Sequence, residues 1–303
     1  MSENVSNNFC GLEEDRAGFD AARIAVLPIP YEATASWGKG TANGPQAIIT
    51  ASQNMELFDE EIFCDTSTLG IFTADPVAVA ESPEKMVDEV ERRCRELLDA
   101  DKFVVGLGGE HSITTGLVRA HAAKFPNLTV LQLDAHADLR DSYEDEKYSH
   151  ASVMRRVLDI CPITQAGIRS LSEEEAPLLA SEDVRTFFAE KIRNMPAWAE
   201  RVADTLTENV YITIDIDVFD PAFVPGTGTP EPGGLNWWQV TGLLRQVCDR
   251  RNVAGFDIVE VMPLAGERSS EFLAAKLAYR LLGYKFMARR HPHLNRQAGP
   301  FPK

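Results

Sequence analysis

The sequence predicts an α/β fold built on strands that pair in parallel. Short runs rich in Val, Ile, Leu and Phe recur along the 303 residues, and stretches with a helical spacing of apolar residues separate them. Strands that alternate with helices pair in parallel through right-handed crossovers, so these runs are expected to share one sheet. The chain shows no internal repeat, low-complexity tract or linker, and a single domain is therefore the simplest expectation.

The predicted strands are short and continuously apolar, and they lie at Ile24–Leu27, Phe103–Leu107, Val130–Leu133, Gln165–Ile168, Val184–Phe188, Val210–Ile216 and Gly255–Val259. The clearest predicted helix has Ser82 as its N-cap and Pro83 in its first turn, followed by an apolar stripe. Another helix is expected from about Ser270. Because ligands gather at the carboxyl ends of parallel strands, the residues that follow each strand are the place to look for chemistry.

The overall charge restricts the kinds of partner. The chain has 46 acidic and 30 basic residues and a formal net charge of −16. A nucleic-acid partner needs a basic footprint, so the charge argues against one. An acidic chain attracts small cationic substrates by long-range steering, although acidic proteins are common in every functional class.

Cysteine usage and hydropathy bear on the compartment. The five cysteines are scattered and form no Cys-x-x-Cys pair, so neither a zinc knuckle nor a disulfide framework is indicated and a reducing compartment fits. The first 20 residues lack the basic start and apolar stretch of a signal peptide. No apolar segment is long enough to span a bilayer. These features predict a cytoplasmic protein without a membrane partner.

The strongest chemical signal follows the strand Val130–Leu133, where Asp134, His136 and Asp138 alternate with alanines. If this segment is extended, the three side chains point to the same side. Grouped in that way, carboxylates and an imidazole repel one another or stay unsatisfied unless a cation joins them. The alternative is a polar loop whose side chains cap a helix.

Two further segments repeat this arrangement at strand ends. Asp215 and Asp217 follow a strand too apolar to be a solvated edge, and a buried pair of like charges is very costly without a cation. His111 follows the strand Phe103–Leu107 after two glycines that permit a sharp turn. Taken alone, a histidine such as His111 is more often structural than a ligand.

Together these segments supply a full set of candidate metal ligands: His111, Asp134, His136, Asp138, Asp215 and Asp217. Four carboxylates carry a charge of −4, which two divalent cations balance and one does not. Oxygen ligands with few imidazoles and no thiolate suit Mn²⁺ better than Zn²⁺. Two such ions would activate a shared water molecule as a nucleophile.

The three segments closely resemble those of the ureohydrolase family, which comprises arginases and agmatinases. The resemblance includes the run Asp220–Leu235, the stretch Tyr31–Ala47 and Glu260, and it extends from about Ile24 to Leu282. It implies a three-layer α/β/α fold around a mainly parallel eight-stranded sheet, in a trimer or hexamer of identical chains. A single domain is expected over residues 1–303, with residues 1–20 and 286–303 as peripheral or flexible ends.

The resemblance also implies two Mn²⁺ ions, with Ni²⁺ or another divalent ion as the alternative. It places one ion among His111, Asp134, Asp138 and Asp215. It places the other among Asp134, His136, Asp215 and Asp217.

The resemblance further assigns His150 as a proton shuttle and Glu260 as the carboxylate that grips the guanidinium group, so both are expected to contact the substrate. Glu260 would hold the planar cation by charge-assisted hydrogen bonds. A hydroxide between the ions would attack the central carbon, and Asp138 would pass a proton to the leaving amine. The expected products are urea and an amine.

The loop Leu139–Ser149 bears on the substrate. It lacks the Asn- and Thr-rich pattern with which arginases read the α-carboxylate and α-amine, and instead it carries four acids, Asp141, Glu144, Asp145 and Glu146. An acidic rim would attract the distal ammonium of agmatine, unless this is simply a solvated loop. Glu231 also has the agmatinase-like form. Agmatine, giving putrescine for polyamine biosynthesis, is therefore the leading expectation.

Other substrates and functions stay open. Ala151-Ser152 replaces the usual Gly-Thr, and Met262 replaces an Asn that many agmatinases have, so substrate choice can differ. The alternative substrates are N1-aminopropylagmatine, guanidinobutyrate, guanidinopropionate, guanidine, arginine and formimidoylglutamate. A non-catalytic binding protein would have lost a ligand, and none is missing. A dinuclear phosphoesterase would show basic residues among the site motifs, which are acidic here.

Overall fold

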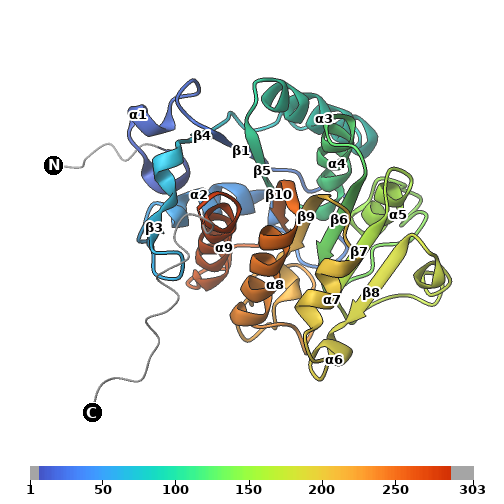
Figure 1. Cartoon of the computed structure of the whole chain (residues 1–303). Coiled ribbons are helices and arrows are strands. Elements are labelled where there is room, and N and C mark those ends of the chain that lie inside the picture. The colour runs from blue at the N-terminus through green and yellow to red at the C-terminus, as the bar shows by residue number, and fades with distance from the viewer. Residues whose placement is uncertain (1–6, 288–303) are drawn as a thin grey trace, which may run out of the picture.

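Eight strands form the central sheet of the computed structural model, which describes residues 7–287 (Figure 1). Their order across the sheet is β4-β1-β5-β10-β9-β6-β7-β8, and every neighbouring pair is parallel. The strands are β1 (Ile24–Ile29), β4 (Ile71–Thr73), β5 (Phe103–Gly108), β6 (Leu128–Leu133), β7 (Ile163–Ile168), β8 (Val184–Phe188), β9 (Asn209–Asp215) and β10 (Asn252–Val259). A separate antiparallel pair joins β2 (Phe58–Asp59) to β3 (Cys64–Asp65).

Helices cover both faces of this sheet. The α-helices are α1 (Glu14–Ala17), α2 (Gly44–Ser52), α3 (Pro83–Asp99), α4 (Thr114–Lys124), α5 (Val153–Leu158), α6 (Ala189–Ile192), α7 (Trp198–Thr205), α8 (Trp237–Arg250) and α9 (Ser269–Phe286). The 3₁₀ helices are η1 (Phe9–Gly11), η2 (Thr41–Asn43), η3 (Thr66–Leu69), η4 (His111–Ile113), η5 (His150–Ser152), η6 (Leu178–Ala180) and η7 (Ile216–Val218).

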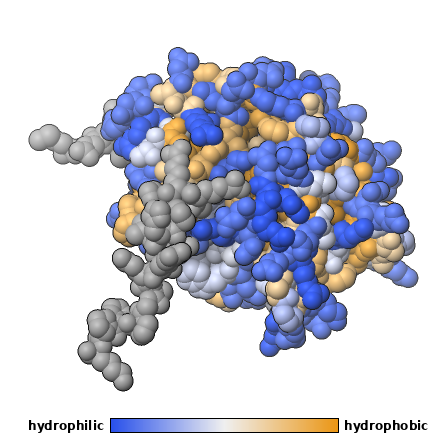
Figure 2. All heavy atoms as spheres, viewed as in Figure 1, coloured by the Kyte–Doolittle hydropathy of each residue, from blue (hydrophilic) through white to orange (hydrophobic). Residues whose placement is uncertain are grey.

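Two apolar cores separate the three layers. Alternate residues of β1 enter different cores: Ile24 and Val26 belong to the core that α2, α7, α8 and α9 cover, whereas Ala25 and Leu27 belong to the core under α3, α4 and α5. A strand buried on both faces has no polar side to show, which is why the predicted strands are continuously apolar. The outer surface over α8 is mainly hydrophilic (Figure 2). The predicted three-layer fold with a parallel eight-stranded sheet is confirmed.

Each strand expected from the sequence overlaps an observed strand, but the edge strand β4 was missed. β4 has only three residues, and two of them are half-buried, so it shows neither a long apolar run nor a clear alternation. The helix expected after Ser82 is α3, in which the Ser82 hydroxyl accepts a hydrogen bond from the backbone N–H of Lys85 and Pro83 lies in the first turn. The helix expected near Ser270 is α9.

The order of the strands matters for the chemistry. Four segments of the candidate site lie at the carboxyl ends of β5, β6, β9 and β10. In that order, they carry His111, Asp134–Asp138, Asp215–Asp217 and Glu260. These four strands are consecutive in the sheet, in the order β5-β10-β9-β6. Parallel strands end on the same side, so the four segments meet at the centre of one sheet edge.

The ends of the described chain differ in part from the peripheral segments that the sequence predicts. Phe9, Cys10 and Leu12 are buried and belong to the core, because η1 packs against α2 and β4. Residues 1–6 and 288–303, which form the rest of the predicted termini, lie outside the described residues. Within residues 7–287, no helix combines the length and the apolar character that a membrane crossing requires.

Candidate functional site

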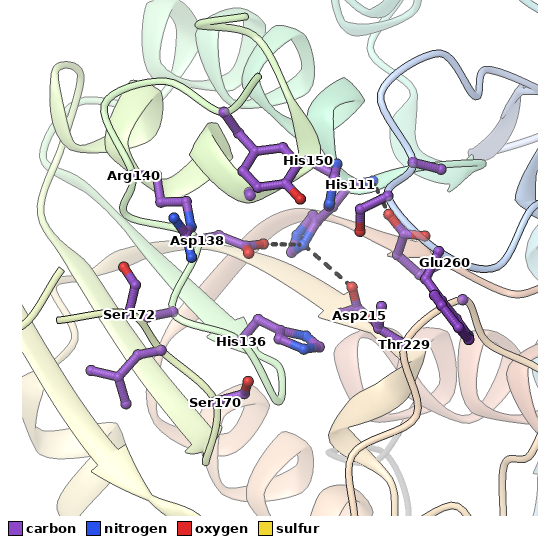
Figure 3. A pocket seen from close by; sticks show the side chains of 18 of the residues that line it. His111, His136, Asp138, Arg140, His150, Ser170, Ser172, Asp215, Thr229 and Glu260 are labelled. Carbon is purple, nitrogen blue, oxygen red and sulfur yellow. Dashed lines mark hydrogen bonds and ion pairs between the residues drawn. The ribbon is translucent and has the colours of Figure 1, made fainter. Parts of the chain in front are cut away.

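A cavity of about 230 Å³ opens at the carboxyl ends of the central strands. Its floor contains His111, His136, Asp138 and Asp215, whose side chains turn toward one another in Figure 3. Glu260 lies on one side of this group (Figure 3). Its wall and mouth include Ala35–Gly38, Arg140, Tyr143, His150, Ser170–Ser172 and Thr229.

The first group of candidate ligands surrounds the His111 ring. His111 Nδ1 lies 3.1 Å from Asp134 Oδ2, 3.1 Å from Asp138 Oδ2 and 3.5 Å from Asp215 Oδ2. This nitrogen is buried and makes no hydrogen bond to any of residues 7–287, although three carboxylate oxygens face it. Ligand atoms that converge on a common point are what a cation between them requires, so the donor set fits a divalent ion.

The second group of candidate ligands surrounds His136. His136 Nδ1 lies 2.9 Å from Asp217 Oδ2 and 3.6 Å from Asp134 Oδ1. Asp134 therefore presents one oxygen to each histidine. Two sets of ligand atoms, His111–Asp134–Asp215 and Asp134–His136–Asp217, are each compact enough to hold an ion, and Asp134 belongs to both.

Backbone N–H groups orient the carboxylates. One oxygen of Asp215 accepts a hydrogen bond from the N–H of Asp217, and one oxygen of Asp217 accepts from the N–H of Ala135. Asp134 Oδ1 accepts from the N–H of His136. In Asp215 and Asp217 the other oxygen is the one that faces a histidine. The backbone at the strand ends therefore fixes which carboxylate oxygen is turned toward the candidate ion sites.

The local backbone differs from the extended segments that the sequence predicts. Asp138 has a φ of 54° and Glu260 a φ of 62°, so both adopt the left-handed conformation that non-glycine residues rarely adopt. Asp217 lies in η7 and not in a strand. Simple alternation therefore does not explain how Asp138 and Asp217 reach the cluster. Strained residues of this kind persist where the surrounding structure holds them, often at functional sites.

The electrostatics of the cluster show a surplus of negative charge. Burial, together with the charge of Asp134, raises the pKa of Asp138 to about 7. Burial and the carboxylates of Asp217 and Asp134 also raise the pKa of Asp215. Burial lowers the pKa of His136, but Asp217 and Asp134 outweigh that effect and raise it to about 12. Without cations the cluster must hold protons, and divalent cations would replace them.

Glu260 joins the cluster to the pocket. Its Oε1 accepts a hydrogen bond of 2.6 Å from the backbone N–H of His111, and its own N–H donates to the carbonyl of Gly109. Burial and the nearby Glu110 raise the pKa of Glu260 to about 8. Its carboxylate thus lies beside the candidate ion sites and lines the cavity.

His150 lies on the wall of the pocket and is held by Thr34. Thr34 Oγ1 donates to Glu110 Oε1 at 2.8 Å, accepts from the backbone N–H of His150 at 3.1 Å, and lies 3.2 Å from His150 Nδ1. The ring edge of Tyr143 packs against the imidazole. Burial and the charges of His136 and His111 lower the pKa of His150 to about 4.

Sequence reasoning missed the residues that support this site. Glu110, next to His111, is not among the candidate residues from the sequence, yet its buried carboxylate accepts four hydrogen bonds and anchors Thr34. Glu175 anchors the pocket wall by accepting from the N–H groups of Leu139 and Ser172. The signal that could have found Glu110 is an acid between a glycine pair and a candidate ligand; for Glu175 we find none.

The acidic rim expected from Asp141, Glu144, Asp145 and Glu146 does not form. None of these four acids lines the pocket, and Asp141 pairs with Arg156 on the outer surface. The same loop instead contributes Arg140 and Tyr143 to the wall. Asp141, Glu144 and Asp145 are exposed to solvent and Glu146 is half-buried, which the number of acids in the loop does not reveal.

Comparison with known proteins gives a consistent result. The model of the arginase family matches residues 22–283. An N(1)-aminopropylagmatine ureohydrolase of Synechocystis is 43% identical over 272 residues, which cover 87% of this chain and 89% of the relative. An agmatinase of Pyrococcus horikoshii is 36% identical, with 86% and 92% covered. Among solved structures, the agmatine ureohydrolase of Thermoplasma volcanium superimposes with a TM-score of 0.83 at 30% identity, covering 96% of this chain and 97% of that one.

Proposed function

The chain belongs to the arginase family of hydrolases that act on guanidino groups, and on this premise we propose that it releases urea from a linear aminoalkyl guanidine, N1-aminopropylagmatine or agmatine. The relatives named for these two substrates support this choice. The longer substrate is favoured because the 43%-identical relative carries its name. The products are then urea and a polyamine.

The single observation that carries the proposal is the buried His111 Nδ1, which faces three carboxylates without a hydrogen bond beside the pocket carboxylate of Glu260. His111, Asp134, Asp138 and Asp215 would hold one divalent ion. Asp134, His136, Asp215 and Asp217 would hold the second. Two Mn²⁺ ions fit this oxygen-rich donor set, and when bound they would lower the pKa of a water molecule and polarise the guanidinium carbon.

The roles of the chain's own residues follow from their positions. Glu260 would accept two N–H hydrogen bonds from the guanidinium group, and the positive charge of the substrate favours the ionised carboxylate. Asp138, at the base of the pocket, would carry a proton from the attacking water to the leaving nitrogen. His150, on the wall, would exchange protons with solvent. One water is consumed and one C–N bond breaks, so that the guanidinium ion becomes urea and an alkylammonium ion.

The mouth of the pocket suits a long cationic chain. Trp37 is 83% exposed and lines the mouth together with Tyr143 and Leu171. Aromatic faces attract ammonium groups, and apolar side chains accept the methylene groups between them. Arg140 on the same wall would oppose a second cation, but it is paired with Glu174.

A urea-release assay on metal-analysed protein tests the proposal. N1-aminopropylagmatine, agmatine, arginine, guanidinobutyrate, guanidinopropionate and guanidine are compared after loading with Mn²⁺, and formimidoylglutamate is assayed for formamide. We expect the highest kcat/KM with N1-aminopropylagmatine and a lower value with agmatine. Urea from arginine alone would contradict the substrate class, and no product from any of these compounds would contradict the function.

We also propose that the protein is a cytoplasmic homo-oligomer, a trimer or hexamer, of one domain per chain. The five cysteines are scattered along the sequence and buried, which is consistent with a reducing compartment. Sedimentation velocity of the purified protein tests the subunit number, and a monomer at micromolar concentration would rule it out.

A further inference from the structure

The far side of the His111 ring is connected to a buried carboxylate. His111 Nε2 lies 2.8 Å from Thr213 Oγ1, and Thr213 Oγ1 lies 2.7 Å from Asp257 Oδ1. Thr213 and Asp257 are direct neighbours across β9 and β10. All three side chains are buried.

The direction of the hydrogen bonds in this chain can be assigned. Asp257 also accepts hydrogen bonds from the hydroxyl groups of Tyr211 at 2.8 Å and Thr114 at 3.0 Å. With Thr213, three hydroxyl groups therefore donate to its two carboxylate oxygens. A carboxylate can only accept. The single hydroxyl proton of Thr213 therefore points at Asp257, and its oxygen is left to accept from His111.

The assignment determines the tautomer of His111. Nε2 must carry the proton that it donates to Thr213, so in the neutral ring that binds a cation the lone pair is on Nδ1. Nδ1 is the nitrogen that faces the carboxylates of Asp134, Asp138 and Asp215. In a neutral imidazole, only the nitrogen without a proton can bind a metal.

A purely structural role explains Asp257 poorly. No Lys or Arg side chain pairs with it in the part of the chain that the structure describes, and burying an unpaired carboxylate costs several kcal/mol. The neighbouring strand has a glycine beside Asp257: a Cβ on Gly106 would lie only 2.9 Å from Asp257 Cβ and would crowd it. A negative charge behind the imidazole makes the ring a better donor to a cation on its other side.

We propose that Asp257, through the hydroxyl of Thr213, is a positioning residue that holds His111 with its proton on Nε2 and its lone pair on Nδ1 toward a divalent cation. The inference rests on the metal centre of the proposed function, and it concerns the ion site of His111 and not that of His136. It assigns a role to a residue that touches neither the ions nor the substrate.

Metal binding is the readout that tests this chain of hydrogen bonds. The full-length protein is stripped with chelator and titrated with Mn²⁺ by calorimetry, and with Co²⁺ by visible absorption. Thr213→Val removes the hydroxyl at nearly constant shape. Asp257→Asn can donate to Thr213 and thereby turn the hydroxyl proton toward His111. We expect each variant to weaken one of the two ion sites by about 10–100-fold and to leave the other near its wild-type affinity.

The chain offers two matched controls. Tyr211→Phe deletes another hydroxyl hydrogen bond to the same carboxylate of Asp257 without breaking the link to His111. Thr213→Ser keeps the hydroxyl. Both should bind the two ions like wild type. A purely structural role for the polar cluster would instead make Tyr211→Phe as harmful as Thr213→Val.

Several outcomes would overturn the inference. It fails if Thr213→Val binds both ions with wild-type affinity, or if Tyr211→Phe loses as much affinity as Thr213→Val. Thermal unfolding of the metal-free variants shows whether each is folded. If Thr213→Val does not fold, Asp257→Asn decides: wild-type affinity for both ions in that variant overturns the inference. Protein that binds two ions but releases no urea would contradict the proposed function alone, whereas failure to bind divalent ions would overturn both.

Discussion

At the scale of single residues, the site brings together buried acids that disfavour one another's ionised form. Asp138, Asp215 and Glu260 are carboxylic groups whose pKa burial raises, and each has another carboxylate nearby. Cations resolve this conflict, since they favour the ionised form of every ligand. Glu260 differs from the ligands because its free side faces the pocket, where a guanidinium group can supply the missing charge.

Replacing Glu260 with Gln tests this difference. Glu260→Gln keeps the shape and can still accept from the N–H of His111, but it loses the charge that binds the guanidinium group. We expect kcat/KM to fall by about tenfold to 100-fold, which corresponds to a charge-assisted hydrogen bond, with two ions per chain retained in elemental analysis. Glu190→Gln, which does not line the pocket, should have no effect. Loss of metal from Glu260→Gln would show that its role is that of a ligand.

His121 shows what a buried histidine does when no carboxylate is near. It lies in α4, its Nδ1 is 2.7 Å from the carbonyl of Leu117, and its Nε2 has no hydrogen-bond partner in the described part of the chain. Burial lowers the pKa of His121 to about 4. The unfolded chain therefore binds one more proton than the folded one between about pH 4 and pH 6.5, so stability is lost as the pH falls through this range.

Replacing His121 with Gln should remove this dependence. Between pH 7 and pH 5 the free energy of unfolding of the wild type should fall by about 2 kcal/mol more than that of His121→Gln. Urea unfolding at both pH values measures the difference. Phe125→Leu, which changes a ring stacked on His121 without changing a titratable group, should lower stability equally at both. Parallel pH profiles for wild type and His121→Gln would show that His121 is not the group involved.

At the scale of elements, the segments after β1 and β5 are joined backbone to backbone. Gly109 N–H donates to the carbonyl of Ile29, and Glu110 N–H donates to the carbonyl of Tyr31. A Cβ on Gly109 would lie only 2.1 Å from the Tyr31 carbonyl oxygen. The close approach sets the position of His111 relative to the loop that holds His150, so it couples the candidate ligands to the pocket wall.

Gly109→Ala should force these two segments apart. We expect the free energy of unfolding to fall by about 1–3 kcal/mol, as for other overpacked sites, together with weaker Mn²⁺ binding. Gly242→Ala is the matched control: this glycine lies in α8 with open space around it, so alanine should raise stability by about 0.5–1 kcal/mol. Chemical unfolding and metal titration measure both effects. Unchanged metal affinity in Gly109→Ala would mean that the contact does not position His111.

At the scale of the whole molecule, charge is the dominant property. A net charge of −16 surrounds a pocket whose proposed substrate is a polycation. A field of this sign draws such a substrate in, and salt screens it over about 10 Å at 0.1 M. The acids of the loop at Asp141–Glu146 then act through the overall field and not as a rim of the pocket.

Ionic strength should therefore affect the capture of substrate and not its conversion. Raising the ionic strength from about 0.02 to 0.3 M should lower kcat/KM for N1-aminopropylagmatine by about threefold or more, with little change in kcat. Steady-state urea release in a series of NaCl concentrations measures both. A parallel fall of kcat, or a constant kcat/KM, would argue against steering.

The sequence by itself determined the parallel α/β class of the fold and indicated where the candidate site lies. Continuous apolar runs mark strands such as β6 and β9, because a strand covered on both faces must be apolar throughout. Acids and histidines placed directly after those runs, Asp134 and Asp215 among them, indicate a cation site because so much buried charge needs one. Both signals are local, so they can be read within a few residues.

Only the tertiary structure decided how these parts meet. The adjacency of β5, β10, β9 and β6, the short edge strand β4 and the left-handed turns at Asp138 and Glu260 are not written in any local pattern. The same holds for the link from His111 to Asp257, in which His111 and Thr213 lie 102 residues apart and Thr213 and Asp257 lie 44 apart. The physical reason is that such contacts depend on which distant segments pack together, and long-range packing leaves no periodic trace in the sequence.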